Sequence, residues 1–153
     1  MPYRYFWLIA GFLLILIMAV YLIINPSYEK SFEAKYYYHM GDYKKSLTLS
    51  KEAFALNVYN RMASTIMAQS QISLQYTEYI RQARQYMKDI DKLAHQDTLT
   101  SGDKAKMKLM AEVVIDGYIK LSPSVVTDKK LVQEAAYYHN EFVKLHEKIS
   151  SSI

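Results

Sequence analysis

Four basic side chains at regular spacing are the first candidates for chemistry. Arg81, Arg84, Lys88 and Lys92 follow one another at intervals of three, four and four residues. Residues at these intervals lie on one face of a helix, so the segment would present a positive stripe. Such a stripe could bind an acidic protein or lipid headgroups. Acidic residues flank the stripe, however, and a solvated helix face explains the same pattern more simply.

Clustered tyrosines form a second candidate partner-binding surface. Tyr36, Tyr37 and Tyr38 are consecutive, and Tyr137 and Tyr138 form a pair near the C-terminus. Consecutive side chains point in different directions around a helix, so the three tyrosines cannot all enter one core. We expect at least one of them to be exposed or to line a groove.

Histidine spacing gives little support for a metal site. The four histidines are His39, His95, His139 and His146. His139 and His146 are seven residues apart on one helix face, whereas helical zinc ligands are usually three or four apart. We therefore expect solvated or core-edge histidines and no bound metal.

Other catalytic patterns are missing from the sequence. The chain has no cysteine, which excludes disulfides and thiolate chemistry. Asp89 and Asp91 are two residues apart and point to different helix faces, so they cannot act jointly on one substrate. No glycine-rich phosphate loop or nucleophile elbow occurs. The net charge of +4 gives no strong case for nucleic acid. We expect no enzyme activity and no cofactor.

One long apolar stretch predicts how these groups are held. Phe6 to Ile24 contains no charged residue and would form a helix roughly 28 Å long, close to the hydrocarbon thickness of a bilayer. It is too long for a signal peptide and no Ala-x-Ala cleavage pattern follows it. Aromatic residues near its two ends are typical of membrane interfaces; they are Tyr3, Tyr5, Trp7, Tyr21 and Tyr28. The sequence therefore predicts a membrane anchor over residues 1–25, with its transmembrane helix at about 6–24.

The orientation of the anchor is a separate prediction. Arg4 and the α-amine lie on one side of it, while Lys30, Lys35 and Lys44 lie on the other, so charge alone does not favour a cytoplasmic N-terminus. We still expect the N-terminus inside, because a long C-terminal domain can translocate largely regardless of its charge. In a bacterial inner membrane this places residues 27–153 in the periplasm.

The rest of the chain, residues 26–153, predicts an all-α domain of about six antiparallel helices. Helices are expected at about 27–40 and 42–56, joined at Gly41-Asp42. The apolar phase from Asn57 to Gln96 changes near Ser70 to Gln75, where we predict a break between two helices. After the turn-rich segment 96–103, in which Thr100 and Asp103 suggest a capping box, a helix runs to about Leu121. The last helix is capped by Thr127 or Asp128 and carries an apolar stripe: Leu131, Ala135, Tyr138, Phe142, Leu145 and Ile149.

Residues 27–60 resemble a tetratricopeptide repeat. Ala34 and Tyr37 match the small and aromatic residues of that family's first helix, Gly41-Asp42-Tyr43 matches its turn, and Ser46 and Ala53 match small positions of its second helix. The resemblance implies a stack of helical hairpins with a surface for protein partners.

This layout leads to a functional hypothesis. We expect a membrane-anchored interaction or scaffold subunit of a bacterial envelope complex, for example a flagellar motor or secretion machinery. Two alternatives remain open: a membrane-tethered sensor that binds a small ligand in a tyrosine-lined pocket, and a chaperone-associated tether.

Overall fold

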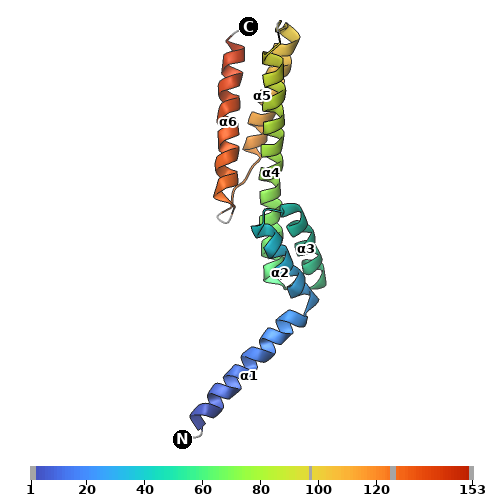
Figure 1. The fold of residues 1–153 in the computed structure, drawn as a ribbon, viewed down its shortest axis with the longest axis vertical. Coiled ribbons are helices and arrows are strands. Elements are labelled where there is room, and N and C mark those ends of the chain that lie inside the picture. The colour runs from blue at the N-terminus through green and yellow to red at the C-terminus, as the bar shows by residue number, and fades with distance from the viewer. Residues whose placement is uncertain (1–2, 97, 125–126, 152–153) are drawn as a thin grey trace. The chain divides into compact units, whose positions relative to one another are not determined.

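A computed structural model describes residues 3–96, 98–124 and 127–151, with side chains of the first helix described for residues 5–21 and 24. Six helices and no strands occur in these ranges (Figure 1), so the predicted all-α class is confirmed. The helices are α1 (Tyr3–Ile24), α2 (Pro26–His39), α3 (Tyr43–Leu56), α4 (Arg61–Ala94), α5 (Ser101–Ile119) and α6 (Lys129–Ser150). They form two compact units, Met1–Gln71 and Ile72–Ile153, and α4 contributes residues to both.

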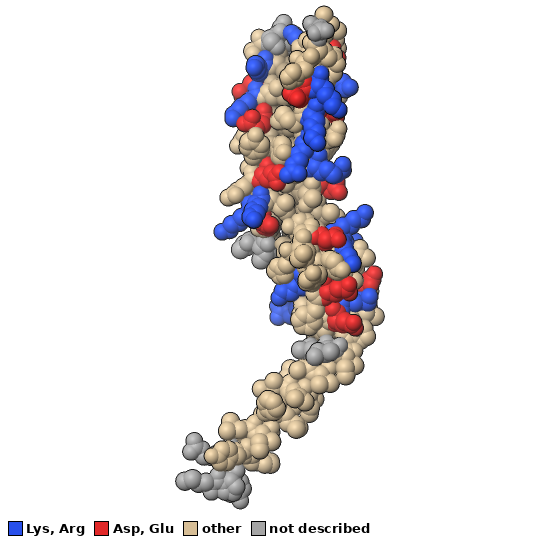
Figure 2. Space-filling model, in the orientation of Figure 1, with Lys and Arg blue, Asp and Glu red and all other residues tan. Residues whose placement is uncertain are grey.

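Helix α1 is apolar around its whole circumference. All of its described side chains are exposed, and Figure 2 shows no acidic or basic colour on them. Tyr3 and Arg4, which entered the predictions on interfacial aromatics and orientation, lie outside the described side chains. Within the described residues, no single helix combines the length and the hydropathy that crossing a membrane requires, although Tyr5–Tyr21 and Pro26–His39 meet the requirement together as a bent pair.

Helices α2 and α3 form the predicted antiparallel hairpin, and local capping residues set its boundaries. The side chain of Asn25 accepts a hydrogen bond from Ser27 N at 3.0 Å, and Pro26 occupies the first turn of α2. Gly41 has φ of +81°, a conformation that favours glycine at a helix end. Asp42 caps α3 by accepting from Lys45 N at 3.0 Å. Both helices agree with the predicted limits to within a residue.

The interior of the first unit is built from small and polar side chains. Ser27 Oγ donates to Ala53 O at 2.8 Å, and Ser46 Oγ donates to Ala34 O at 2.7 Å, which fixes the antiparallel pairing of α2 with α3. Serine and alanine permit this close approach because they project little beyond the backbone. The small residues Ser46, Ser50 and Ala53 of α3 are buried, while three larger residues of the same helix are only half-buried: Tyr43, Leu47 and Phe54.

The predicted break near Ser70 to Gln75 is wrong, because α4 is one continuous helix of 34 residues. Five helices therefore follow α1 in the described residues, rather than about six. The buried positions along this part of α4 step by three or four residues without interruption: Ala63, Ile66, Ser70, Ser73, Tyr76 and Ile80. Two of the middle members are serines, so a pattern built on apolar residues alone shows a change of phase where the buried stripe actually continues.

The second unit has an apolar core formed by the C-terminal part of α4 with α5 and α6. Phe142 is fully buried at its centre. The predicted capping box of α5 is confirmed, since Asp103 N donates to Thr100 Oγ1 at 3.2 Å and Thr100 N donates to Asp103 Oδ2 at 3.1 Å. Asp128 caps α6 by accepting from Lys130 N at 2.9 Å. The predicted α6 stripe faces this core, with Ala135, Phe142 and Ile149 buried and the other three half-buried.

Candidate docking surfaces

The basic stripe on α4 is largely neutralised by neighbouring groups. Arg81 donates to Glu78 Oε2 from Nε at 2.9 Å and from Nη2 at 2.7 Å. Arg84 pairs with Glu134 and also donates from Nε to the Tyr138 hydroxyl at 3.2 Å. Lys92 Nζ lies 3.9 Å from Asp89 Oδ1. The stripe is therefore a set of local ion pairs rather than one positive field.

Lys88 is the exception, and it lies in a groove between α4 and α6. A pocket of about 480 Å³ has a mostly apolar floor of Met87, Ile90, Ala94, Met107 and Leu145. Its charged lining residues are Lys88, Asp91, Glu141, Lys144 and Lys148. A second pocket, of about 400 Å³, is lined by Thr77, Ile80, Arg81, Arg84, Gln85, Lys88, Leu131 and Glu134. Because Lys88 lines both pockets, they adjoin, and we call the combined feature the α4–α6 groove.

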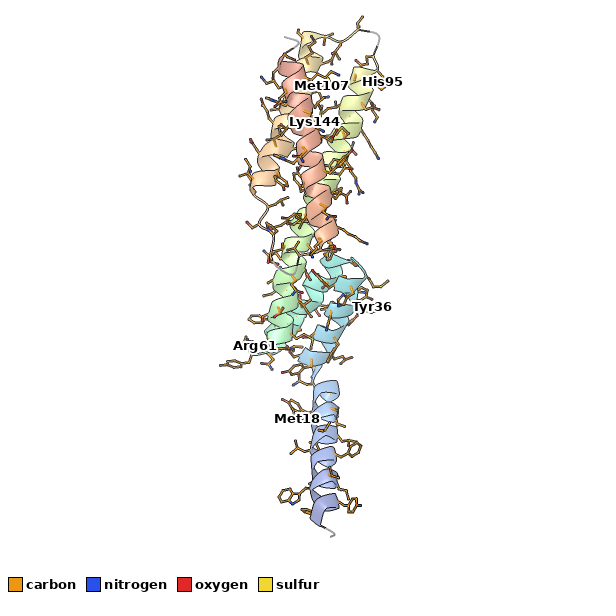
Figure 3. The ribbon with its side chains drawn as sticks, turned by 90° about the vertical axis from the view of Figure 1, so that its left-hand side faces the viewer. Met18, Tyr36, Arg61, His95, Met107 and Lys144 are labelled. Carbon is orange, nitrogen blue, oxygen red and sulfur yellow. The ribbon has the colours of Figure 1, made fainter. Side chains whose placement is uncertain are left out.

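Uncompensated positive charge remains in this groove. Lys144 Nζ donates to Glu141 Oε1 at 2.9 Å, and this bond raises the pKa of Lys144. His95 Nδ1 lies 3.4 Å from Asp91 Oδ1. Lys88 and Lys148 make no ion pair with any other described residue. Figure 3 labels Lys144 on α6 and Met107 on α5 at the same end of the second unit. Two unpaired ammonium groups beside an apolar floor can bind a ligand that is both apolar and acidic.

The tyrosine run on α2 is distributed as its spacing predicts. Tyr36 is exposed, and Tyr37 and Tyr38 are half-buried. The Tyr37 hydroxyl accepts a hydrogen bond from Lys45 Nζ at 2.5 Å. Tyr38 packs edge-on against Tyr43, with ring centroids 5.4 Å apart, and lines a pocket of about 380 Å³ with residues of α4. The run therefore offers one exposed ring and one ring at a pocket, not a single aromatic face.

The second tyrosine pair is divided in the same way. Tyr137 is exposed, whereas Tyr138 is half-buried and its hydroxyl accepts the hydrogen bond from Arg84. The structure thus brings together two predicted site residues, Arg84 and Tyr138, that are 54 positions apart in the chain. Their mutual contact uses polar groups that would otherwise be available to a partner.

The histidines make separate contacts. His139 stacks on Tyr118 with ring centroids 4.3 Å apart, and His146 Nε2 lies 3.2 Å from Glu112 Oε1. No cluster of three or more potential metal ligands occurs among the described residues. These contacts place the two histidines at the edges of the second unit's core.

Sequence reasoning missed two sets of residues. Lys144 and Lys148 of the groove are four residues apart on α6, a spacing that places both on one face of the helix. Together with the neighbouring Leu145, this spacing indicates a basic and apolar surface on α6. Tyr79 was also missed: its buried hydroxyl has no partner among the described atoms, and burial raises its pKa. Tyr79 lies against Gly117, a contact between distant segments that leaves no local sequence signal.

No protein-family model, curated protein or solved structure matches this chain.

Proposed function

We propose that the chain is a membrane-anchored interaction protein of a bacterial envelope assembly, in which α1 is the anchor and the helices after it bind a protein partner. The observation that carries the proposal is the exposure of every described apolar side chain of α1. Burying one large apolar side chain is worth about 1.5–3 kcal/mol, so leaving so many of them in water would be very costly.

A bilayer is the covering that best fits this helix. The apolar side chains surround α1 completely, whereas a helix packed on a protein core needs only one apolar stripe. A helix also satisfies its backbone hydrogen bonds internally, as the hydrocarbon region requires. The proposed orientation keeps the N-terminus cytoplasmic and residues 27–153 periplasmic.

The proposed docking surface is the α4–α6 groove. Its occupant would be a segment of a partner protein that inserts apolar residues over Met87, Ile90 and Leu145 and brings carboxylates to Lys88 and Lys148. The acidic residues Asp91 and Glu141 on the rim disfavour a uniformly anionic surface, since like charges repel. A segment with acidic groups at defined positions can meet the two lysines and avoid the two acids. The resemblance of residues 27–60 in sequence to a tetratricopeptide repeat supports a protein as the partner.

Charge reversal in full-length protein tests the docking surface. The variant Lys88→Glu with Lys148→Glu should lose a partner that is cross-linked stoichiometrically in intact cells. Lys92→Glu is the matched control, because Lys92 lies on the same helix outside the groove lining and should leave the cross-link unchanged. A partner retained equally by both variants would refute the groove, and a chain found only as an uncross-linked monomer would refute the scaffold hypothesis.

Two further measurements separate the anchor from the alternatives. Extraction of membranes with alkaline carbonate should leave the chain in the membrane pellet; its release would refute the anchor. If small apolar carboxylates instead raise the melting temperature through the groove in the wild type but not in the double lysine variant, the chain is a ligand sensor, since a ligand that binds only the folded form stabilises it.

A further inference from the structure

We propose that the loop between α3 and α4 is a second membrane contact, which enters the lipid headgroup region beside the end of α1. We call Leu56, Val58 and Tyr59, with the adjacent Arg61, the α3–α4 tip. The inference rests on the proposed function, because it requires α1 to be the membrane anchor.

Hydrogen bonds hold this loop against the first turn of α2. Asn60 Nδ2 donates to Ser27 O at 3.2 Å and to Ser27 Oγ at 2.8 Å. Ser27 is only three residues beyond Ile24, the last residue of α1, and three residues span at most about 11 Å. Figure 3 shows Arg61 at the end of the α2–α3 hairpin where α2 begins. The α3–α4 tip therefore lies within a short distance of the point where the anchor ends, whatever the angle between α1 and α2.

The tip exposes apolar side chains although its backbone is fixed. Leu56 is 57% exposed, Val58 is 58% exposed and Tyr59 is 86% exposed. Between them, Asn57 Oδ1 accepts from Tyr59 N at 3.0 Å, and Asn60 N donates to Asn57 O at 3.0 Å. Because the turn is already ordered, burying these side chains in a membrane would cost little additional conformational entropy.

The composition of the tip suits the headgroup region better than water or the hydrocarbon interior. Tyrosine is enriched at membrane interfaces, where the ring is buried and the hydroxyl stays hydrated. Arg61 is exposed and can pair with lipid phosphate. The headgroup region is about 5 to 8 Å deep on each side of the hydrocarbon, which matches the reach of a loop tied to the first turn after the anchor. The tip would thus act with α1 as a two-point attachment of the α2–α3 hairpin.

The absence of cysteine from the sequence makes a site-specific test direct. Single-cysteine variants Tyr59→Cys, Met40→Cys and Phe12→Cys of the full chain would carry a nitroxide label in phosphatidylethanolamine–phosphatidylglycerol vesicles. Met40 is the matched control, since it is 67% exposed and follows α2 at the opposite end of the hairpin. Phe12 is 68% exposed in the middle of α1 and reports on the anchor itself.

Collisions of the label with oxygen, which partitions into lipid, and with a nickel chelate, which stays in water, measure its depth. The label at position 12 should be protected from nickel, the label at 40 fully accessible, and the label at 59 several-fold less accessible than that at 40. Equal nickel accessibility at 59 and 40, with position 12 protected, would overturn the membrane contact alone. Nickel access at position 12 would overturn the anchor and this inference together. A Val58→Cys label should repeat the result at 59; full water accessibility at 58 would count equally against it.

Discussion

Replacement of Asn60 by alanine should open the first unit while leaving the second intact. Asn60 is fully buried, and its amide donates to three acceptors: Ser27 O at 3.2 Å, Ser27 Oγ at 2.8 Å and Ser31 Oγ at 2.9 Å. Its Oδ1 accepts from Ala63 N at 3.1 Å, which caps the start of α4. One side chain thus joins α2 to α4 across 33 residues of sequence.

The size of the effect follows from these contacts. The two amide hydrogens can support two full hydrogen bonds, each worth about 0.5–1.5 kcal/mol net. The lost cap adds about 1 kcal/mol. The free energy of opening should therefore fall by about 2–4 kcal/mol, which is a roughly 30- to 1,000-fold increase in the population of the open state.

Hydrogen exchange with mass spectrometry can measure this change in full-length protein in detergent micelles. Peptides from α2, α3 and the first turns of α4 should exchange faster in Asn60→Ala, whereas peptides from α5 and α6 serve as an internal control. If the α2 and α3 peptides of Asn60→Ala are as well protected from exchange as those of the wild type, Asn60 does not hold the first unit together.

The Asn60→Asp variant separates hydrogen-bond chemistry from side-chain volume. A carboxylate keeps the cap but presents oxygen to Ser27 and Ser31, whose hydroxyls already donate to Ala53 O and Ser27 O. Ala63 N is a single donor to a carboxylate that is otherwise fully buried, so burial would raise the pKa of the new carboxyl and favour its neutral form in the folded state. The variant should be most stable below the unfolded pKa of about 4 and lose stability as pH rises through the raised folded value. Asn60→Ala should not show this dependence; identical pH profiles for the two variants would contradict the donor argument.

Three further predictions concern individual residues. Phe142→Ala should lower the free energy of unfolding of the second unit by about 3–5 kcal/mol, because the ring is fully buried; denaturation monitored at α5 and α6 checks this, and a loss below about 1 kcal/mol would contradict the burial. Gly41→Ala should destabilise the hairpin by about 1–2 kcal/mol, because φ is +81° at this position. Gly117→Ala should be neutral or stabilising by up to about 1 kcal/mol, because alanine favours a helix and its new Cβ would lie at an acceptable 3.4 Å from Tyr79 Cδ2. Melting temperatures that shift in the reverse order would refute this comparison. The Thr100 hydroxyl holds the pKa of Asp103 below its usual 3.8, so the cap stabilises α5 above about pH 4 and this stabilisation is lost as pH falls through the lowered pKa. NMR titration of Asp103 should give a midpoint below 3.8 in the wild type and a midpoint closer to 3.8 in Thr100→Val. A wild-type midpoint above 3.8 would contradict the capping box.

The parts of the fold that the sequence predicted depend on short-range chemistry. Helix caps and turns could be predicted from the sequence alone because each involves residues within four positions of one another. They are Asn25-Pro26, Gly41-Asp42, and Thr100 with Asp103. The α6 stripe was legible for a similar reason, because its members repeat with the period of a helix.

The parts that were missed depend on contacts between distant segments. The α4–α6 groove joins residues near position 88 to residues near position 145, and no local pattern specifies which helix faces will meet. The neutralisation of Arg84 by Glu134 arises in the same way. Buried serines also explain the wrongly predicted break in α4. Ser70 hydrogen-bonds Ser46 at 2.7 Å inside the first unit, whereas a serine in a sequence normally indicates a surface or a turn.

The serine-rich interior of the first unit has a thermal consequence. Exposing apolar surface on unfolding raises the heat capacity, while exposing polar surface lowers it. The first unit buries Ser27, Ser31, Ser46, Ser50, Asn60 and Ser70, whereas the second buries mainly aromatic and aliphatic groups. The heat-capacity increment of unfolding per residue should therefore be smaller for the first unit than for the second, and the stability curve of the first unit should be flatter. Cooling should then weaken the apolar second unit sooner than the hydroxyl-lined first unit.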